Sequence, residues 1–239
     1  MEYVEKRVRK EIRAQVDFSR KNMKIIKLYK KTGNSVLTLM SVLNPEKYGY
    51  TLDEIMKIDK KTISCSHCGP MRRQLMNKIS EYSKSDYVAL GINLDDYSQS
   101  ILMNVAKGDV SRYARMAPHS YIRDGLVPRI LPLRKIPEKE VVLYALLSGI
   151  DFDSSWCPYY SMAQRNTFRE VIEKLEKETP GTKFAIVKFF DETRPAIKKS
   201  ISTESIQLNK CKICGASTPG EICEVCEDLE SIRDLEKAA

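Results

Sequence analysis

Four cysteines near the C-terminus have the spacing of a tetrahedral metal site. Cys211 and Cys214 form one Cys-x2-Cys pair, and Cys223 and Cys226 form a second pair after an eight-residue spacer. The two thiolates of such a pair can face one ion, and the spacer lets the pairs fold onto each other. Because so short a segment buries little apolar surface, the metal supplies much of its folding energy. The spacing predicts a ribbon in which these four cysteines hold Zn²⁺.

Three further cysteines leave their chemistry open. Cys65 and Cys68 form another Cys-x2-Cys pair at the start of an expected helix, and Cys157 lies far away, before Pro158. Three thiolates alone do not close a tetrahedral site. They are compatible with zinc completed by His67, with an iron–sulfur cluster that keeps one iron open, or with plain buried thiols. The start of a helix favours metal binding, because it lowers the pKa of a thiol.

The positive charge of the chain is concentrated at its N-terminus. Residues 1–31 hold eleven Lys or Arg and four acidic residues, whereas the whole chain has a net charge of +8. A local basic block suits a polyanion such as RNA, and a solvated helix face is the alternative. The candidate RNA-binding residues are Lys6, Arg7, Lys10 and Arg13.

The composition argues against a membrane protein and against a disordered chain. Charged residues make up 30% of the 239 residues and hydrophobic residues 42%. The apolar run Val141–Ile150 is about half the length that crosses a bilayer, and Met1–Lys10 has no apolar signal core. The odd count of seven cysteines argues against a disulfide framework. We expect a cytoplasmic protein with no membrane association.

Apolar periodicity and turn residues predict helices that alternate with strands. We expect strands over residues 23–28, 87–92 and 127–133, and helices over residues 2–20, 36–43, 51–58, 65–84, 93–107, 138–148, 165–178, 183–199 and 227–239. Strands that alternate with helices favour an α/β fold with a parallel sheet.

Several motifs resemble those of tRNA thiolation enzymes, the TtuA- and TtcA-like PP-loop ATPases. The first is Leu90–Asp96, followed by Gln99–Asn104 and Gly108-Asp109. The other segments that match in the same order are Val127–Arg134, Ile136–Val141, Cys157–Tyr159, Pro180–Lys183 and the C-terminal ribbon. The colinear similarity covers roughly residues 48–230.

This resemblance implies an activity and a cofactor. Such enzymes use ATP and Mg²⁺ to replace the C2 oxygen of a tRNA uridine with sulfur. In the TtuA-like branch, a [4Fe–4S] cluster is held by cysteines that match Cys65, Cys68 and Cys157. Its open iron carries the sulfide, which explains three thiolates. As candidate catalytic residues, Arg72 matches a basic position after the second cysteine, and Asp95 and Asp96 match the carboxylate position near ATP.

The aligned phosphate loop departs from the family pattern. A PP-loop reads S-G-G-x-D-S, and its glycines let backbone N–H groups approach the pyrophosphate. The candidate nucleotide-binding residues here are Lys31, Thr32, Gly33, Asn34, Ser35 and Gly91, which form a poorer cradle. A family segment between the loop helix and Tyr50, with strands of the sheet, is absent, and Ile92 replaces a histidine. The nucleotide site is predicted to be degenerate.

The expected architecture is a basic N-terminal helix (1–22), a truncated PP-loop ATPase-like α/β domain (23–207), and a zinc ribbon with a helical tail (208–239). The favoured function is a degenerate paralogue that keeps the iron–sulfur site, the zinc ribbon and a tRNA-binding surface. The alternatives are an active ATP-dependent tRNA uridine 2-sulfurtransferase, and a structural zinc and RNA-binding protein without a cluster. The expected partners are tRNA, a sulfur-carrier protein, and a second copy or a full-length paralogue that covers the open sheet edge.

Overall fold

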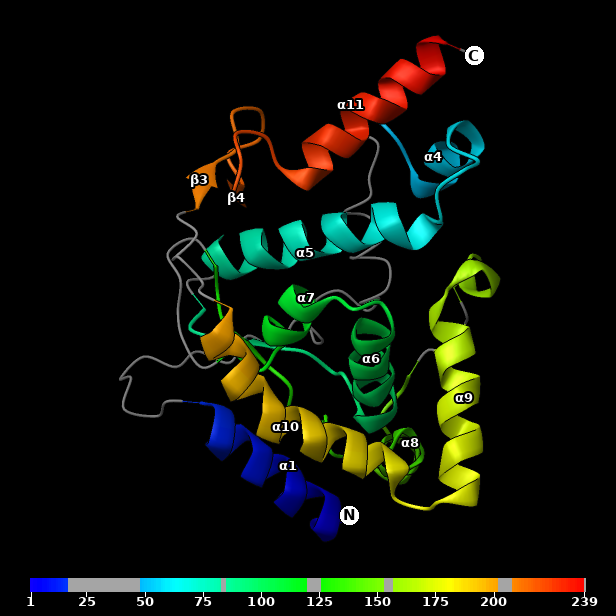
Figure 1. Cartoon of the computed structure of the whole chain (residues 1–239), viewed down its shortest axis with the longest axis vertical. Helices are drawn as coiled ribbons and strands as arrows, with labels where there is room; N and C mark the ends of the chain where they lie inside the picture. Colours follow the sequence, from blue (N-terminus) through cyan, green and yellow to red (C-terminus); the bar gives the residue numbers. More distant parts are fainter. Residues whose placement is uncertain (17–47, 83–84, 120–125, 153–156, 202–207, 239) are drawn as a thin grey trace. The chain divides into compact units, whose positions relative to one another are not determined.

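The computed structural model describes residues 1–16, 48–82, 85–119, 126–152, 157–201 and 208–238 (Figure 1). These residues form two compact units. The first unit contains residues 1–16, 87–119, 128–152 and 157–201, and the second contains residues 48–82, 85–86, 126–127 and 208–238. Each unit therefore draws on segments that are far apart in the chain, and each has its own buried cluster.

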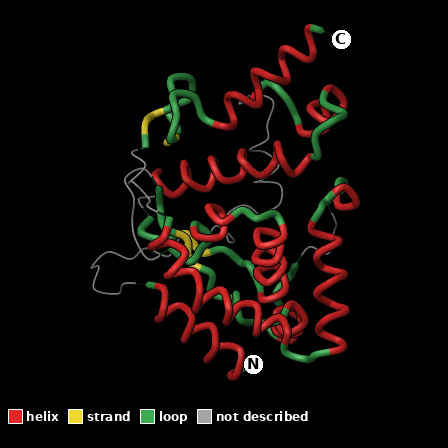
Figure 2. The backbone as a smooth tube through the Cα atoms, viewed as in Figure 1, coloured by secondary structure: helices red, strands yellow, loops and turns green. Residues whose placement is uncertain are grey.

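A short parallel strand pair lies within the first unit and is yellow in Figure 2. β1 (Val88–Ala89) pairs with β2 (Arg129–Ile130), with Val88 opposite Arg129. Further backbone bonds from Val88 to Pro128 and from Leu90 to Ile130 extend the ladder. The helices of this unit are α1 (Glu2–Gln15), α6 (Leu94–Ala106), α7 (Val110–Ala114), α8 (Glu138–Leu147), η3 (Tyr160–Met162), α9 (Arg165–Glu178) and α10 (Thr182–Ser200).

The core of the first unit forms where α6, α7 and α10 meet. Phe190 of α10 is fully buried, and its ring stands edge-on to Tyr97 at 5.5 Å and to Tyr113 at 4.9 Å between centroids. Edge-to-face geometry at these separations is favourable for aromatic pairs. Leu94 and Ile101 lie on the same face of α6 as Tyr97 and are buried in this cluster. The packing fixes the first turn of α6, which follows β1.

A buried arginine joins α1 to α10. The side chain of Arg134 is only 8% exposed, and it donates to Glu11 of α1 over 2.9 Å and to both carboxylate oxygens of Asp191 on α10. Burial alone would raise the pKa of Glu11, but the cations of Arg134 and Lys135 lower it. Gln15 adds two hydrogen bonds to the backbone of Leu131. The basic N-terminal helix is thus an integral part of the first unit.

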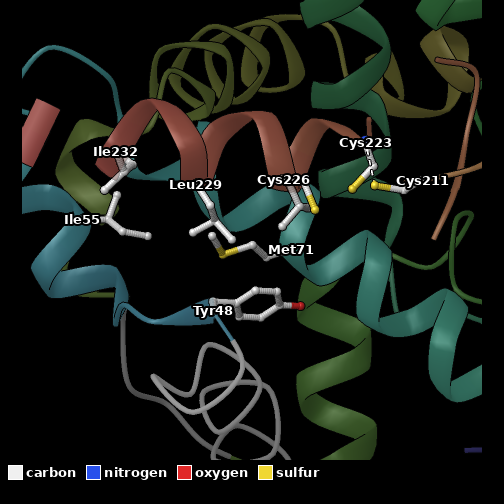
Figure 3. Close-up of a cluster of buried hydrophobic side chains, with 9 residues drawn as sticks. Tyr48, Ile55, Met71, Cys211, Cys223, Cys226, Leu229 and Ile232 are labelled. Atoms are coloured by element: carbon white, nitrogen blue, oxygen red, sulfur yellow. Dashed lines mark hydrogen bonds between the residues drawn. The ribbon is translucent and has the colours of Figure 1, made fainter. Parts of the chain in front are cut away.

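The second unit packs helices against the cysteine ribbon. Its elements are α4 (Leu52–Ile58), α5 (Ser64–Tyr82), β3 (Asn209–Lys210), β4 (Ser217–Thr218) and α11 (Glu224–Lys237). Thr51 and Glu54 form a capping box that starts α4. Figure 3 shows Leu229 and Ile232 of α11 facing Ile55 and Met71, with the sulfur atoms of Cys211, Cys223 and Cys226 at one end of the row. The ribbon therefore shares a core with α4 and α5.

The structure confirms the predicted fold class. Helices dominate, the pair of strands β1 and β2 is parallel, and the C-terminal cysteines form a ribbon. Asn93, one of two candidate caps with Asp95, caps α6, and α9 has the predicted bounds. The predicted strand 23–28 and helix 36–43 lie outside the described residues, and the domain boundaries stay a prediction. No helix within the described ranges is long and apolar enough to span a bilayer.

Candidate metal and nucleotide sites

The C-terminal ribbon brings the two cysteine pairs together through a short hairpin. β3 and β4 are antiparallel, and Cys211 follows β3 directly. Gly215 comes after the first pair with φ +70°, a conformation that favours glycine, and its N–H donates to the carbonyl of Cys211. Cys223 caps α11, so the second pair occupies the first turn of a helix. Local backbone geometry therefore turns each pair inward.

The arrangement of the four sulfur atoms fits a single metal ion. The Sγ atoms of Cys211, Cys214, Cys223 and Cys226 all lie within 4.8 Å of one another, and those of Cys214 and Cys223 are 3.5 Å apart. Tetrahedral zinc with Zn–S bonds of about 2.3 Å separates its sulfur ligands by about 3.8 Å. The cluster thus has the donor set and the spacing of a metal-binding group, as the sequence predicted.

The environment of these thiols differs from one cysteine to the next. For Cys211, burial alone would raise the pKa, but the backbone N–H groups of Cys214, Cys223 and Ile213 lower it to about 6. Burial raises the pKa of Cys223 and Cys226 above the usual thiol value. A bound dication offsets this cost, because coordination holds a thiol in its deprotonated form.

Two polar residues that sequence reasoning missed lie beside this cluster. Gln74 of α5 is buried, and its Nε2 atom lies 3.5 Å from Sγ of Cys214 and 3.4 Å from Sγ of Cys223. The hydroxyl of Tyr48 donates to Oε1 of Gln74 over 3.2 Å. Burial, together with the nearby thiolates, raises the pKa of Tyr48. No spacing rule links these residues to the cysteines, since the contact arises only from packing.

The third cysteine pair lies in the first turn of α5. Cys65 is exposed and Cys68 is partly exposed. His67, between them, is buried, and its Nδ1 lies 2.8 Å from Oδ2 of Asp228 on α11, while its Nε2 lies 3.5 Å from Oδ2 of Asp59. Carboxylates thus face both ring nitrogens of His67. This arrangement ties α5 to α11 within the second unit.

Cys157 belongs to the first unit, whereas Cys65 and Cys68 belong to the second. Cys157 is exposed, and its carbonyl accepts from the N–H of Tyr160 over 2.8 Å at the start of η3. The three-cysteine site stays a prediction drawn from the sequence.

The adjacent aspartates at the start of α6 have different environments. Asp95 is buried, and one of its carboxylate oxygens accepts a hydrogen bond from Nζ of Lys183 over 2.5 Å. The other oxygen accepts from the N–H of Glu138 over 2.7 Å, and this second bond caps the start of α8. Burial alone would lower the pKa of Lys183, but the carboxylates of Asp95 and Glu173 raise it. Asp96 is 37% exposed and pairs with Arg165 over 3.1 Å. Asp95 thus holds helices together, and Asp96 is the accessible carboxylate.

The other predicted site residues lie at the surface or outside the described residues. Gly91 follows β1 and is exposed, and Arg72 is exposed on α5. The stretch Lys31–Ser35, predicted as the phosphate loop, lies outside the described residues.

The basic residues of α1 divide between two faces. Arg7 donates to Glu140 over 2.8 Å and is largely covered, so its charge is paired within the chain. Lys6, Lys10 and Arg13 are exposed and recur at helical spacing. We call these three residues the basic face of α1.

Comparisons with known proteins identify relatives of the chain. A probable sulfurtransferase of Methanocaldococcus jannaschii is 38% identical over 204 residues, which are 83% of this chain and 58% of the relative. The tRNA 2-thiolation protein NcsA of Haloferax volcanii is 33% identical, with 78% of this chain and 61% of the relative covered. Cytoplasmic tRNA 2-thiolation protein 1 of Arabidopsis thaliana is 32% identical, with coverages of 82% and 54%. No protein-family profile matches the chain.

A solved structure agrees with these relatives. The U34-tRNA thiolase NcsA of Methanococcus maripaludis, determined with its [4Fe–4S] cluster, aligns with a TM-score of 0.58 and 35% identity. The alignment covers 76% of this chain and 61% of the thiolase. These matches confirm the resemblance that the motifs predicted. The chain spans little more than half the length of the curated relatives it matches.

Proposed function

Because this chain is a homologue of the tRNA 2-thiolation proteins, we propose that it works in tRNA thiolation as a degenerate paralogue. In this role it keeps a three-cysteine iron–sulfur site, a zinc ribbon and a tRNA-binding surface, and it acts as a partner or carrier. The observation that carries the proposal is the likeness, at 35% identity, to a thiolase that contains a [4Fe–4S] cluster.

The iron–sulfur part of the proposal rests on the chemistry of three accessible thiols. Cys65 and Cys68 lie three residues apart in one helical turn, so their side chains share a face. Cys157 is exposed, and it completes a set of three ligands that leaves one iron of a [4Fe–4S] cluster open. An open iron supplies a place for sulfide when the cluster is bound. His67 contacts two carboxylates, which favours a cluster over zinc with His67 as fourth ligand.

The degenerate part of the proposal rests on the phosphate loop and on Asp95. The stretch Lys31–Ser35 keeps one glycine of the two in a PP-loop. Both carboxylate oxygens of Asp95 accept hydrogen bonds, one from Lys183 and the other from the N–H of Glu138. A carboxylate committed to structural contacts is a poor ligand for Mg²⁺ or a reacting base.

The specific alternative is an active tRNA uridine 2-sulfurtransferase, which Asp96 favours. Its carboxylate follows the carboxyl end of β1 and is accessible, and ligands bind at this edge in open α/β sheets. In that case ATP with Mg²⁺ binds near Asp96, and Arg165, which already contacts Asp96, stabilises developing negative charge. A structural zinc and RNA-binding protein without a cluster is the third possibility.

Metal analysis of the full chain, purified without oxygen, tests the proposal. We expect a brown protein that contains iron, acid-labile sulfide and zinc. Cys157→Ser should lose the iron and its visible absorption but keep the zinc, and Cys214→Ser should lose the zinc. A colourless wild-type protein that contains zinc alone would support the structural alternative instead.

Nucleotide measurements separate the degenerate paralogue from the active enzyme. We expect no heat of binding when Mg²⁺ and ATP are titrated into the cluster-loaded chain, and no release of AMP with tRNA and sulfide. Release of AMP that depends on tRNA, and its loss in Asp96→Asn, would establish the active enzyme and overturn the degenerate assignment.

The remaining expectations concern location and partners. Curated relatives are described as cytoplasmic, and we propose the same location for this chain. We further propose tRNA as its RNA partner, a sulfur-carrier protein as its sulfide source, and a second copy or a full-length paralogue as its dimer partner. Size-exclusion chromatography with light scattering, alone and with the paralogue, measures the last of these.

A further inference from the structure

The carboxamide of Gln74 faces the four-cysteine cluster from the neighbouring helix. Gln74 lies on α5 and is only 8% exposed. Its Nε2 atom is 3.5 Å from Sγ of Cys214 and 3.4 Å from Sγ of Cys223. A single nitrogen therefore contacts one sulfur atom from each Cys-x2-Cys pair.

The thiolates and Tyr48 together set which end of this carboxamide faces the sulfur atoms. The buried hydroxyl of Tyr48 donates to Oε1 of Gln74 over 3.2 Å. The amide NH₂ group has two hydrogens, one for each sulfur, whereas the reverse orientation would aim oxygen lone pairs at thiolates. Both ends of the buried carboxamide are thus satisfied only in the orientation that donates to sulfur.

We propose that Gln74 is a positioning residue of the ribbon metal centre, where it donates hydrogen bonds to the thiolates of Cys214 and Cys223 and is itself oriented by Tyr48. The inference rests on the metal site of the proposed function and is independent of thiolation activity. Four thiolates around a dication carry excess negative charge, and N–H donors stabilise that charge. Partners of this kind change metal affinity by about 10-fold to 100-fold.

The contact also links the ribbon metal to the helix that begins with Cys65 and Cys68. Gln74 lies on the same helix, which is further held to α11 by Arg73 with Glu224 and by His67 with Asp228. Figure 3 shows Met71 of this helix beneath Leu229 and Cys226 of α11. Metal in the ribbon therefore stabilises the position of α5 against α11.

Three substitutions separate donation from packing. Gln74→Met keeps the length of the side chain and removes the donor, and Gln74→Glu keeps the shape but replaces the donor with negative charge. Tyr48→Phe leaves the donor and removes its orienting hydroxyl. Glu81→Gln, at an exposed position of the same helix, is the control. Circular dichroism checks that each full-length variant folds.

Zinc affinity and cobalt absorption give two independent readouts. In competition with a chromophoric chelator, zinc affinity should fall by about 10-fold in Gln74→Met, further in Gln74→Glu, and less in Tyr48→Phe. The thiolate-to-metal charge-transfer band of the Co²⁺-substituted chain should move to longer wavelength in the same order, because the sulfur lone pairs lose stabilisation. Glu81→Gln should match the wild type in both measurements.

Two results would overturn this inference. Wild-type zinc affinity in Gln74→Met is one, and weakened affinity with an unshifted cobalt band is the other, since packing alone then explains the loss. A wild-type chain that takes up neither Zn²⁺ nor Co²⁺ is a different failure, because it removes the ribbon metal site from the proposed function as well.

Discussion

The environment of His119 predicts that the stability of the folded chain depends on pH. Burial, followed by the positive charge of Arg129, lowers the pKa of His119 from 6.5 to about 4. The Nδ1 atom accepts a hydrogen bond from the N–H of Arg129 over 3.2 Å, and protonation removes that acceptor. The unfolded chain protonates this side chain near pH 6.5, so the unfolded state binds more protons between pH 6.5 and 4. The stability that neutral His119 contributes is fully present above pH 6.5, and it is lost as the pH falls from 6.5 to about 4.

We therefore expect the urea midpoint of the wild type to fall more steeply between pH 6.5 and 4 than that of His119→Asn, which carries no titratable group. Above pH 7 the two midpoints should differ by a constant amount. Parallel curves across the whole range would mean that His119 titrates normally in the folded protein.

Loss of charge should cost much more stability at Asp95 than at Asp96. Asp95→Asn leaves the buried ammonium of Lys183 with Glu173 as its remaining carboxylate, and we expect a loss of about 3 kcal/mol in the free energy of unfolding. Asp96→Asn breaks a surface pair with Arg165 and should cost less than about 1 kcal/mol. Urea denaturation of the two variants at pH 7 measures both values. Equal losses would contradict the division into a structural and an accessible carboxylate.

At the scale of elements, the sequence predicted helices better than strands. α9 has its predicted bounds because its apolar residues keep helical spacing over several turns. β1 and β2 have two residues each, which is fewer than predicted. A strand extends only as far as its hydrogen-bonded partner does, and an apolar run in the sequence does not indicate where that partner begins or ends. α7 was missed, since five residues hold no full apolar period.

At the candidate sites too, features set by neighbouring residues could be predicted from the sequence, whereas contacts between distant segments could not. Cysteine spacing predicted the ribbon because each pair turns locally toward the one ion that both pairs can share. The contacts of Gln74 and Lys183 could not be predicted, since they join helices far apart in the sequence.

The ribbon should lose its ordered backbone when its metal is removed. β3 and β4 have two residues each, and the backbone bonds from Cys211 and Gly215 start at or beside the cysteines that would hold the metal. A chelator should therefore expose the N–H groups of Cys211, Lys212 and Gly215, which now donate within the ribbon, to hydrogen exchange. The amides of α6, in the first unit, are the internal control. Unchanged protection in the ribbon would mean that the apolar core suffices without metal.

At the scale of the whole molecule, the two units divide the chemistry between them. Cys65, Cys68 and the ribbon belong to the second unit, whereas Cys157, Asp96 and the basic face of α1 belong to the first. The three cysteines proposed to hold a cluster are therefore drawn from both units. The proposed RNA contact needs only the first, because α1 is held there by Glu11 and Gln15.

Binding of tRNA by the basic face of α1 should release counterions and hence depend on salt. Each phosphate contact contributes about −0.7 to −0.9 to the slope of the logarithm of the association constant against the logarithm of the salt concentration. Replacing Lys6, Lys10 and Arg13 together by Gln should reduce the magnitude of that slope by about two to three, measured by fluorescence anisotropy with labelled tRNA. A matched control replaces Lys174, Lys177 and Lys188, which are exposed on α9 and α10, and changes the net charge equally. Its slope should stay near that of the wild type. An equal reduction in both triple variants would assign the effect to net charge and leave α1 without a specific role in RNA binding.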